Sequence, residues 1–169
     1  MPAASCDFSF SFHLRQRERF HEGSLAHEWR DRYPQLFDAD DQRMLTTQHQ
    51  RRYHFFEWLS AILLFESTGY LSMVEKYTSQ SHRSKRQRLE ALLPSALFEW
   101  LSANESGQPD LFVYDSTTLD WYFCEVKGGQ DRIRANQADW MARLVAVLIA
   151  QGISHRNRTR VLCLQQIDA

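Results

Sequence analysis

The fold of this chain is decided by one stretch, Gly107-Gln108-Pro109-Asp110-Leu111-Phe112-Val113-Tyr114, followed after a short segment by Trp121-Tyr122-Phe123-Cys124-Glu125-Val126-Lys127-Gly128-Gly129. Both apolar runs are short and rich in aromatic and β-branched residues, which favours β-strands. Residues 115–120 between them are mostly polar, as expected of a turn. The stretch therefore predicts a β-hairpin.

Acidic and basic side chains stand where the two predicted strands meet. Pairing within the hairpin brings Asp110, at the start of the first strand, close to Glu125, near the end of the second. Because side chains alternate between the faces of a strand, Glu125 and Lys127 point the same way, and Cys124 and Val126 point the opposite way. The spacing predicts that two carboxylates and one amine converge at one edge of the sheet.

Such a convergence has a chemical consequence. Two carboxylates side by side repel each other and raise each other's pKa unless a divalent cation neutralises the pair. Hard oxygen ligands suit Mg²⁺ or Mn²⁺, with water and phosphate oxygens completing the coordination. The amine of Lys127 would orient or deprotonate the attacking water and stabilise the charge that develops on the phosphate. The arrangement is that of a metal-dependent nuclease.

A simpler interpretation is that Asp110 caps a turn after Pro109, while Glu125 and Lys127 form an exposed charge pair. The context favours the nuclease. Charged residues are unusual at the end of an aromatic strand, and the glycines at 128 and 129 allow a sharp turn and the close approach of a large group. Residues 131–140 then open an amphipathic helix that supplies cationic and amide groups beside the proposed metal.

These residues resemble a known family. The segment from Gly107 to Trp140, with Gly-Gln-Pro-Asp-Leu-Phe-Val-Tyr, Glu-Val-Lys-Gly-Gly-Gln-Asp-Arg-Ile-Arg, and Gln137 with Trp140, is similar to the virus-type replication-repair nuclease (VRR-NUC) domain. That domain is a branch of the PD-(D/E)xK superfamily and also ends the Fanconi-associated nuclease. The resemblance implies an α/β fold with a restriction-endonuclease-like core, in which a mixed central sheet is flanked by helices.

The resemblance also implies roles for individual residues. Asp110, Glu125 and the main-chain carbonyl of Val126 would hold the divalent metal, Mg²⁺ or Mn²⁺. Lys127 would be the catalytic base or an electrostatic stabiliser. Gln137 corresponds to the helix glutamine that the family places beside the site.

The family uses a further glutamate on an upstream helix. Glu57, embedded in the apolar run from Tyr53 to Glu66, is the preferred candidate for this metal ligand and catalytic residue. Glu66 comes about two and a half helical turns later and points in nearly the opposite direction, so both cannot bind one ion. Glu28 is a third candidate. Alternatively, Glu57 faces solvent and pairs with an arginine at 51 or 52.

The whole chain of 169 residues is expected to form a single domain, 1–169, with a mainly helical part, 1–106, and the nuclease core motifs in 107–169. Helices are expected at 25–33, 40–66 (one or two), 84–93, 95–102 and 134–151, and a last strand at 159–164. Residues 70–77 are expected to be a turn or helix. No strand is evident between Glu57 and Gly107, which predicts a helical insertion there. The alternation of Phe8, Phe10 and Phe12 predicts an edge strand or a partner-binding arm.

The charge pattern limits how the protein could bind nucleic acid. A net charge of −1 excludes the global basic field of an electrostatic nucleic-acid coat, so contacts must be local. Arg132 and Arg134 follow the catalytic strand directly, and a second basic run at 82–88 contains Lys85 and Arg86. We expect these four residues to bind DNA phosphates, with binding that weakens steeply as salt increases.

The cysteines and the apolar runs indicate in which cellular compartment the protein is expected. Cys6, Cys124 and Cys163 are odd in number and widely separated, which predicts neither a disulfide framework nor a zinc site, and Cys124 is expected in the core. This use of cysteine indicates a cytoplasmic protein. No export signal or membrane span is found.

Together these features predict hydrolysis of phosphodiester bonds in branched or flapped DNA, in repair or recombination. Each chain would carry one active site, so cutting both strands of a junction would require a two-fold homodimer. Two other functions remain open: a nucleic-acid-binding module that does not hydrolyse, and a nuclease of phage, restriction or mobile-element origin that cuts plain duplex DNA.

Overall fold

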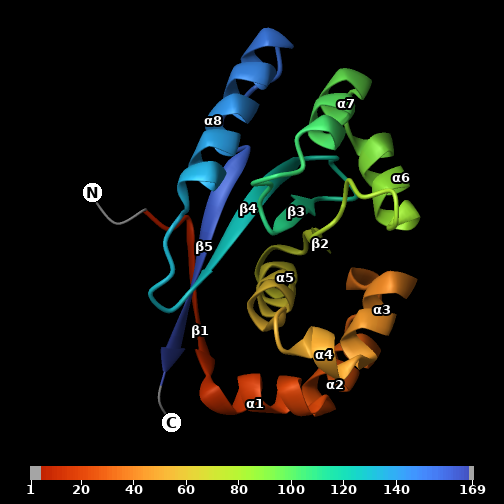
Figure 1. Cartoon of the computed structure of the whole chain (residues 1–169), viewed down its shortest axis with the longest axis vertical. Helices are drawn as coiled ribbons and strands as arrows, with labels where there is room; N and C mark the ends of the chain where they lie inside the picture. Colours follow the sequence, from red (N-terminus) through yellow and green to blue (C-terminus); the bar gives the residue numbers. More distant parts are fainter. Residues whose placement is uncertain (1–4, 168–169) are drawn as a thin grey trace.

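The computed structural model describes residues 5–167, without the side chains of 49 and 50. The ends of the expected single domain, 1–4 and 168–169, lie outside the described residues. One mixed sheet of five strands forms the centre of the molecule, in the order β1-β5-β4-β3-β2 (Figure 1). The strands are β1 (Phe8–His13), β2 (Leu71–Val74), β3 (Leu111–Tyr114), β4 (Trp121–Gly128) and β5 (Thr159–Ile167). β3 is antiparallel to both of its neighbours, whereas β1, β5 and β4 run parallel.

Helices pack on both faces of this sheet, which confirms the predicted α/β class with a restriction-endonuclease-like arrangement. One face carries α5 (Phe55–Thr68), and beyond it lie α1 (Leu14–Glu22), α2 (Ser24–Arg32), α3 (Ala39–Thr46) and α4 (Gln48–Arg51), with a short 3₁₀ helix at Pro34–Leu36 between α2 and α3. The other face carries α6 (Arg83–Leu92), α7 (Ser95–Ala103) and α8 (Ala135–Ala150) (Figure 1). The expected helical region 40–66 is thus divided among three helices.

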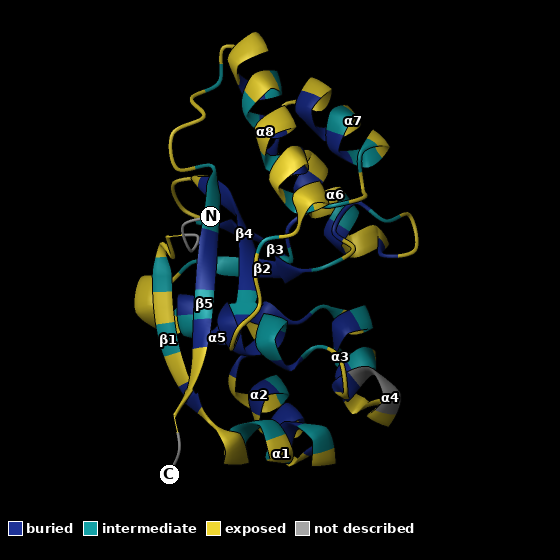
Figure 2. Cartoon of the chain, turned by 60° about the vertical axis from the view of Figure 1, so that its left-hand side comes forward, coloured by how far each residue is buried: buried dark blue, intermediate teal, exposed yellow. Residues whose placement is uncertain are grey.

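Strict alternation along β3 and β4 explains why two separate cores form. Leu111, Val113 and Cys124 belong to the core under α5, whereas Phe112 and Phe123 belong to the core under α6 to α8. Both strands are therefore buried on both faces, as Figure 2 shows for the centre of the sheet. The prediction that Cys124 packs in the core is confirmed.

The prediction of a turn or helix at 70–77 is wrong, because Leu71–Val74 forms β2. β2 pairs antiparallel with β3, with Leu71 opposite Tyr114 and Val74 opposite Leu111. Gly69, with φ of 77°, ends α5 and lets the chain turn into the strand. The strand missing from the sequence interpretation is therefore present. Along the chain, α6 and α7 are the helices between it and β3.

The first and last strands lie side by side at one edge of the sheet. Of the two interpretations of Phe8, Phe10 and Phe12, the structure shows the edge strand, with Phe8 opposite Leu162 of β5. The prediction of unpaired cysteines, on which the cytoplasmic location was based, is wrong for Cys6 and Cys163, which form a disulfide with Cα atoms 5.9 Å apart. Their separation of 157 residues conceals this proximity in the sequence.

Within residues 5–167, none of the helices has both the length and the apolar character that crossing a membrane requires.

Candidate active site

The predicted hairpin brings its acidic residues together at one end of the β3–β4 pair. Leu111 lies opposite Cys124, so Asp110 stands just before β3 and Val126 lies beyond the end of the ladder. The main-chain N–H of Val126 donates to Oδ2 of Asp110 at 2.8 Å. This bond holds the Asp110 carboxylate against the strand that carries Glu125.

Glu125 is the centre of a buried polar network. It is 1% exposed, and its Oε1 accepts hydrogen bonds from Nζ of Lys127, at 2.7 Å, and from Nε2 of Gln137. Its Oε2 is buried and has no hydrogen-bond partner in the described part of the chain. The side chain of Lys127 is 11% exposed, so the interpretation of Glu125 and Lys127 as an exposed charge pair is wrong.

Gln137 connects this network to α8. Its Oε1 accepts from Nζ of Lys127 at 3.0 Å and from the main-chain N–H of Arg134 at 2.9 Å. The second bond belongs to the capping box at the start of α8, in which Gln137 is the third helical residue. The helix terminus therefore fixes the amide that orients the lysine.

Burial raises the pKa values of both hairpin carboxyls. Burial raises the pKa of Asp110 well above its ordinary value, repulsion by Glu125 adds to this, and the N–H of Val126 opposes it. Burial also raises the pKa of Glu125, against the opposing effects of Lys127, Asp110 and Gln137. Burial thus disfavours the charged forms of both carboxyls, and only Glu125 has an ammonium, that of Lys127, beside it.

Residues 107–109 fix the backbone that leads into Asp110. The hydroxyl of Tyr77 donates to the carbonyl of Pro109 at 2.8 Å, and Nε2 of Gln108 donates to the carbonyl of Leu101 at 2.8 Å. Gly107 has φ of 88°, and a Cβ there would lie 2.8 Å from the carbonyl oxygen of Asn136. Glycine is required at this position because α8 begins directly against it.

The glycine at position 128 is explained by a side chain that packs against it. A Cβ at Gly128 would lie 2.6 Å from the ring of Phe56, so α5 packs directly on β4 there. The large group whose close approach the sequence suggested is therefore, at Gly128, an aromatic ring of the protein itself.

Among the three upstream candidates, only Glu57 lies near the hairpin carboxylates. Burial raises its pKa to about 7, and repulsion by Glu75 and Glu125 adds to this. Its Oε2 is buried without a hydrogen-bond partner among the described residues. Glu66 instead accepts from the hydroxyl of Tyr33, and Glu28 pairs with an arginine of α1 at 2.7 Å.

Sequence reasoning missed two residues beside Glu57. Glu75 directly follows β2, and its main-chain N–H donates to the carbonyl of Asp110 at 2.8 Å. His54 precedes α5, and its Nδ1 lies 3.3 Å from Oε2 of Glu75. Had β2 been recognised, antiparallel pairing would have placed the end of β2 beside the start of β3, and so Glu75 beside Asp110.

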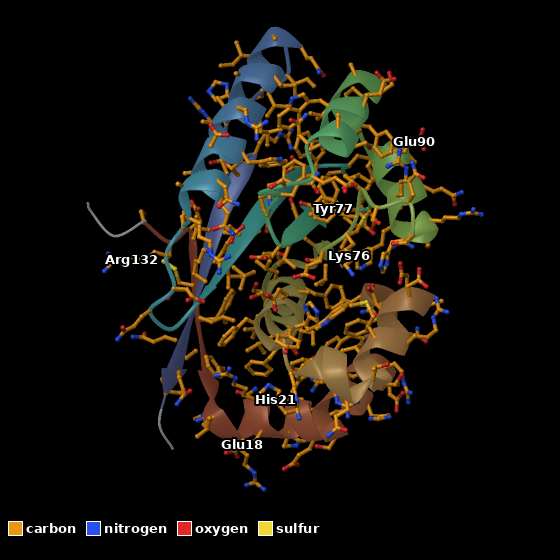
Figure 3. All side chains as sticks on the ribbon, in the orientation of Figure 1. Glu18, His21, Lys76, Tyr77, Glu90 and Arg132 are labelled. Carbon is orange, nitrogen blue, oxygen red and sulfur yellow. A yellow bond between two sulfur atoms is a disulfide. The ribbon has the colours of Figure 1, made fainter. Side chains whose placement is uncertain are left out.

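The basic residues predicted to bind DNA divide into two groups. Arg132 and Arg134 are exposed on the segment between β4 and α8, and Arg132 points away from the molecule (Figure 3). Lys85 is 5% exposed, pairs with Asp41 and donates to the carbonyl of Val74 at 2.6 Å, so its predicted role at the DNA is wrong.

Arg86 is also engaged within the protein. Its guanidinium lies 4.7 Å from the ring centre of Phe98 and donates to the carbonyl of Thr78 and to the hydroxyl of Ser102. The side chain is half-buried, and both of these hydrogen bonds come from Nη1. Arg132 and Arg134 are therefore the better placed of the predicted DNA contacts.

The residues at this site fit a divalent metal ion. Glu57 and Glu125 each keep one buried carboxylate oxygen without a hydrogen-bond donor. Carboxylate oxygens are the ligands that Mg²⁺ and Mn²⁺ prefer, and a buried unpaired oxygen is costly unless a cation or donor reaches it. Asp110, Glu125, Glu57 and the carbonyl of Val126 could hold such an ion.

Comparison with known protein families identifies this arrangement. The family model of the VRR-NUC domain matches residues 44–151, more than half of the chain. The match contains Glu57, Asp110, Glu125, Lys127 and Gln137. No curated protein and no solved structure matches the chain. The chain belongs to the VRR-NUC domain family, a family of nucleases.

Proposed function

We propose that this protein is a DNA nuclease that hydrolyses phosphodiester bonds and depends on Mg²⁺ or Mn²⁺. The observation that carries the proposal is the pairing of Asp110 with Glu125, in which Oε1 of Glu125 holds the Lys127 amine and Oε2 stays without a partner among the described residues. A purely structural ion pair would not need a second buried carboxylate beside it.

The chain supplies distinct roles at this site. Asp110, Glu125, Glu57 and the carbonyl of Val126 would hold the ion, which when bound polarises a phosphate oxygen and lowers the pKa of a water. Lys127 positions the attacking water for in-line attack, and its ammonium stabilises the negative charge that develops on the phosphate. Gln137 keeps the Lys127 amine beside Glu125.

Contacts to DNA would come from the exposed segment that follows β4. Arg132 and Arg134 lie next to the catalytic strand in the sequence and carry charges that can neutralise phosphates. Each phosphate contact releases condensed counterions, so the affinity would fall steeply with salt. Arg132→Ala and Arg134→Ala would each reduce the slope of log affinity against log salt by about one unit, measured by fluorescence anisotropy with labelled DNA.

Cleavage assays test the proposal. The purified chain is incubated with end-labelled duplex, flap, splayed-arm and four-way DNA, with Mg²⁺, Mn²⁺ or EDTA. Product is expected only with metal and is expected to be lost in Asp110→Ala and Lys127→Ala. The matched control is Asp139→Ala, because this aspartate lies on the same helix as Gln137 and its side chain is 66% exposed.

The same assay separates the other functions. DNA binding in EDTA with no product under any condition would indicate a non-hydrolysing binding module and contradict the proposal. Sequence-specific cutting of plain duplex would indicate a nuclease of phage, restriction or mobile-element origin.

We further propose that the substrate is branched or flapped DNA of repair or recombination, on the strength of the family resemblance. Symmetric cleavage of a four-way junction needs two active sites, and one chain provides one, so we propose a homodimer for that reaction. Sedimentation of the protein with and without junction DNA measures this. A strict monomer that cuts junctions symmetrically would contradict it.

A further inference from the structure

We propose that a cavity at the start of β4 and β5 binds a nucleotide, with its phosphate on arginine side chains and its base on aromatic rings. An unpaired nucleotide of DNA and a free mononucleotide both carry this chemistry. The proposal deepens the nuclease function and rests on it for the choice of DNA as a ligand, because it names a contact for DNA outside the catalytic site. Its test does not depend on cleavage.

The cavity lies at the end of the sheet opposite to the catalytic residues. Its volume is about 460 Å³, within the range of sites that hold small ligands. Residues of β1, the end of α5, the start of β4 and the segment 156–160 line it. β4 runs from this cavity to the catalytic site, beside the parallel β5 (Figure 1). Tyr122 in the lining and Lys127 are five residues apart on this strand, about 17 Å at the rise of a β-strand.

Positive charge dominates the lining. It contains three arginines, Arg156, Arg158 and Arg160, and one acid, Asp120. Arg158 pairs with Asp120 at 2.8 Å, so two guanidiniums remain without a carboxylate partner among the described residues. The carbonyl end of α5 at Thr68 also borders the cavity, but its partial negative charge is smaller than two full positive charges. The cavity therefore favours an anion.

Aromatic rings form a wall of the cavity. The rings of Phe8 and Tyr122 are stacked with their centres 6.0 Å apart, and the ring of Tyr70 lies 6.2 Å from that of Tyr122. The guanidinium of Arg160 lies 5.4 Å from the ring centre of Phe8 and 5.1 Å from that of Tyr122. Phe8 and Tyr70 are half-buried, so part of each stays accessible to a ligand. Nucleobases stack on such rings and on guanidinium planes.

Two polar groups of the lining residues are buried without a partner. Nε of Arg160 and the hydroxyl of Tyr122 form no hydrogen bond within the described part of the chain. Burial raises the pKa of Tyr122, so its hydroxyl keeps its proton and can donate. A buried donor without an acceptor costs free energy. Phosphate oxygens are strong acceptors for guanidinium donors, so a nucleotide provides what the protein itself does not.

Arg158 has a structural role and is not expected to contact the nucleotide. Its guanidinium lies 4.2 Å from the ring centre of Trp121 and donates to Asp120 and to the carbonyl of Trp121. Its Nε donates to the carbonyl of Ser154 at 3.3 Å. These contacts fix the turn before β5 and place Arg156, which is exposed, beside the cavity. The site is thus formed before a ligand arrives.

The competing explanation is that Arg160 only stabilises the fold by its contact with the two rings. Fluorescence anisotropy with labelled single-stranded oligothymidylate separates the two, and EDTA removes the metal that the proposed cleavage needs. Arg160→Met keeps an unbranched side chain over the rings but removes the charge. We expect binding about tenfold weaker, with the slope of log affinity against log salt reduced by about 0.7 units. A purely structural contact predicts a lower melting temperature and unchanged affinity.

Tyr70→Leu tests the aromatic wall in the same assay. We expect binding about tenfold weaker, as for the loss of one stacked base, with little change in the salt slope. The matched control is Arg43→Met, because this side chain is 79% exposed on α3, and its affinity should equal that of the wild type. Duplex DNA of the same sequence should respond less than about twofold to Tyr70→Leu, since paired bases are not free to stack.

Calorimetric titration with thymidine monophosphate distinguishes the two sources of the nucleotide. Binding that Arg160→Met abolishes would support a free mononucleotide as the occupant. No binding of the monophosphate, with the oligonucleotide result intact, would support the DNA strand. Inorganic phosphate that binds as tightly as the monophosphate would overturn recognition of a base.

Ultraviolet cross-linking of an iodouracil oligonucleotide to the wild type needs no variant. Adducts are expected in the peptides that contain Phe8 or Tyr70. Adducts only elsewhere, or unchanged oligonucleotide affinity in either variant, would overturn the nucleotide site. If the variants bind normally and DNA is still cut, the nuclease proposal stands without this site. If the variants lose affinity and the wild type cuts no DNA, the site stands and the nuclease proposal fails.

Discussion

The two carboxylate oxygens of Glu125 have different surroundings. Oε1 accepts from Lys127 and Gln137, whereas Oε2 has no hydrogen-bond partner in the residues that the structure describes. One oxygen therefore orients the amine, and the other remains available to a ligand. A single side chain can link the proposed metal to the proposed water-positioning group in this way.

Replacing Asp110 by asparagine should stabilise the protein in EDTA. The substitution removes a buried like charge but retains an oxygen that can accept from the N–H of Val126. At pH 8 we expect a higher free energy of unfolding, because burial and repulsion by Glu125 disfavour the charged form of the wild-type carboxyl. Because the raised pKa makes the folded wild type bind a proton more readily than the unfolded chain, the difference should narrow as the pH falls towards 4.

Urea unfolding measures this effect, with the exposed Asp139→Asn as control. Adding MnCl₂ should reverse the order, since the wild type gains binding energy that the variant loses. A variant less stable than the wild type in EDTA at pH 8 would show that Asp110 is not electrostatically strained.

The sequence could predict some site residues and not others, for physical reasons. Hairpin pairing and strand alternation were sufficient to place Glu125 and Lys127 on one face, with Asp110 beside them. His54 and Glu75 escaped prediction because β2 has only four residues and is buried on both faces, so it shows no polar alternation. Lys85 was misassigned because a basic run gives no indication of which of its members faces the core.

At the scale of elements, Lys85 links α6 to two other elements of the fold. Its ammonium pairs with buried Asp41 of α3 and donates to the end of β2, so one side chain connects three elements. This contact explains why a charged residue is buried in α6.

Lys85→Met should therefore destabilise the fold and leave DNA affinity unchanged. Removing one partner of a buried ion pair costs about 3 kcal/mol, because the other remains desolvated without compensation. Thermal unfolding and DNA anisotropy measure the two effects, and Arg83→Met, exposed on the same helix, is the control. A loss of DNA affinity with normal stability would restore the original prediction for Lys85.

The junction between residue 107 and α8 is a second element-scale contact. Gly107→Ala should lower the free energy of unfolding by about 2 kcal/mol or more, because it combines an unfavourable φ with a clash against the carbonyl of Asn136. Gly152→Ala is the matched control, since Gly152 has φ of 68° but no neighbouring atom within 4 Å. Denaturant titration should show a clearly smaller loss for the control, and equal losses would exclude the clash.

At the scale of the whole molecule, the helical layers and the sheet could be predicted in outline. The pairing of the first strand with the last could not. Local patterns indicated most helices and the hairpin. The pairing of β1 with β5, and with it the disulfide, depends on contacts between the two ends of the chain, which no local pattern contains.

Reduction of the Cys6–Cys163 disulfide should lower the stability of the whole fold. A cross-link spanning 157 residues removes loop entropy from the unfolded chain, worth up to about 5 kcal/mol in the chain-entropy model. Urea midpoints with and without dithiothreitol measure the effect. The double variant Cys6→Ser and Cys163→Ser should not respond to the reductant, and an identical midpoint for the wild type in both conditions would show that the bond contributes nothing.

The position of β5 also has a practical consequence for anyone shortening this protein. The family match ends at residue 151, yet β5 begins at Thr159 and pairs with the stretch of β4 that contains Glu125 and Lys127. A recombinant fragment limited to residues 44–151 would lack β5 and leave the edge of β4 that carries Glu125 and Lys127 unpaired. Bare edges recruit other strands, so such a fragment should precipitate instead of serving as a minimal enzyme.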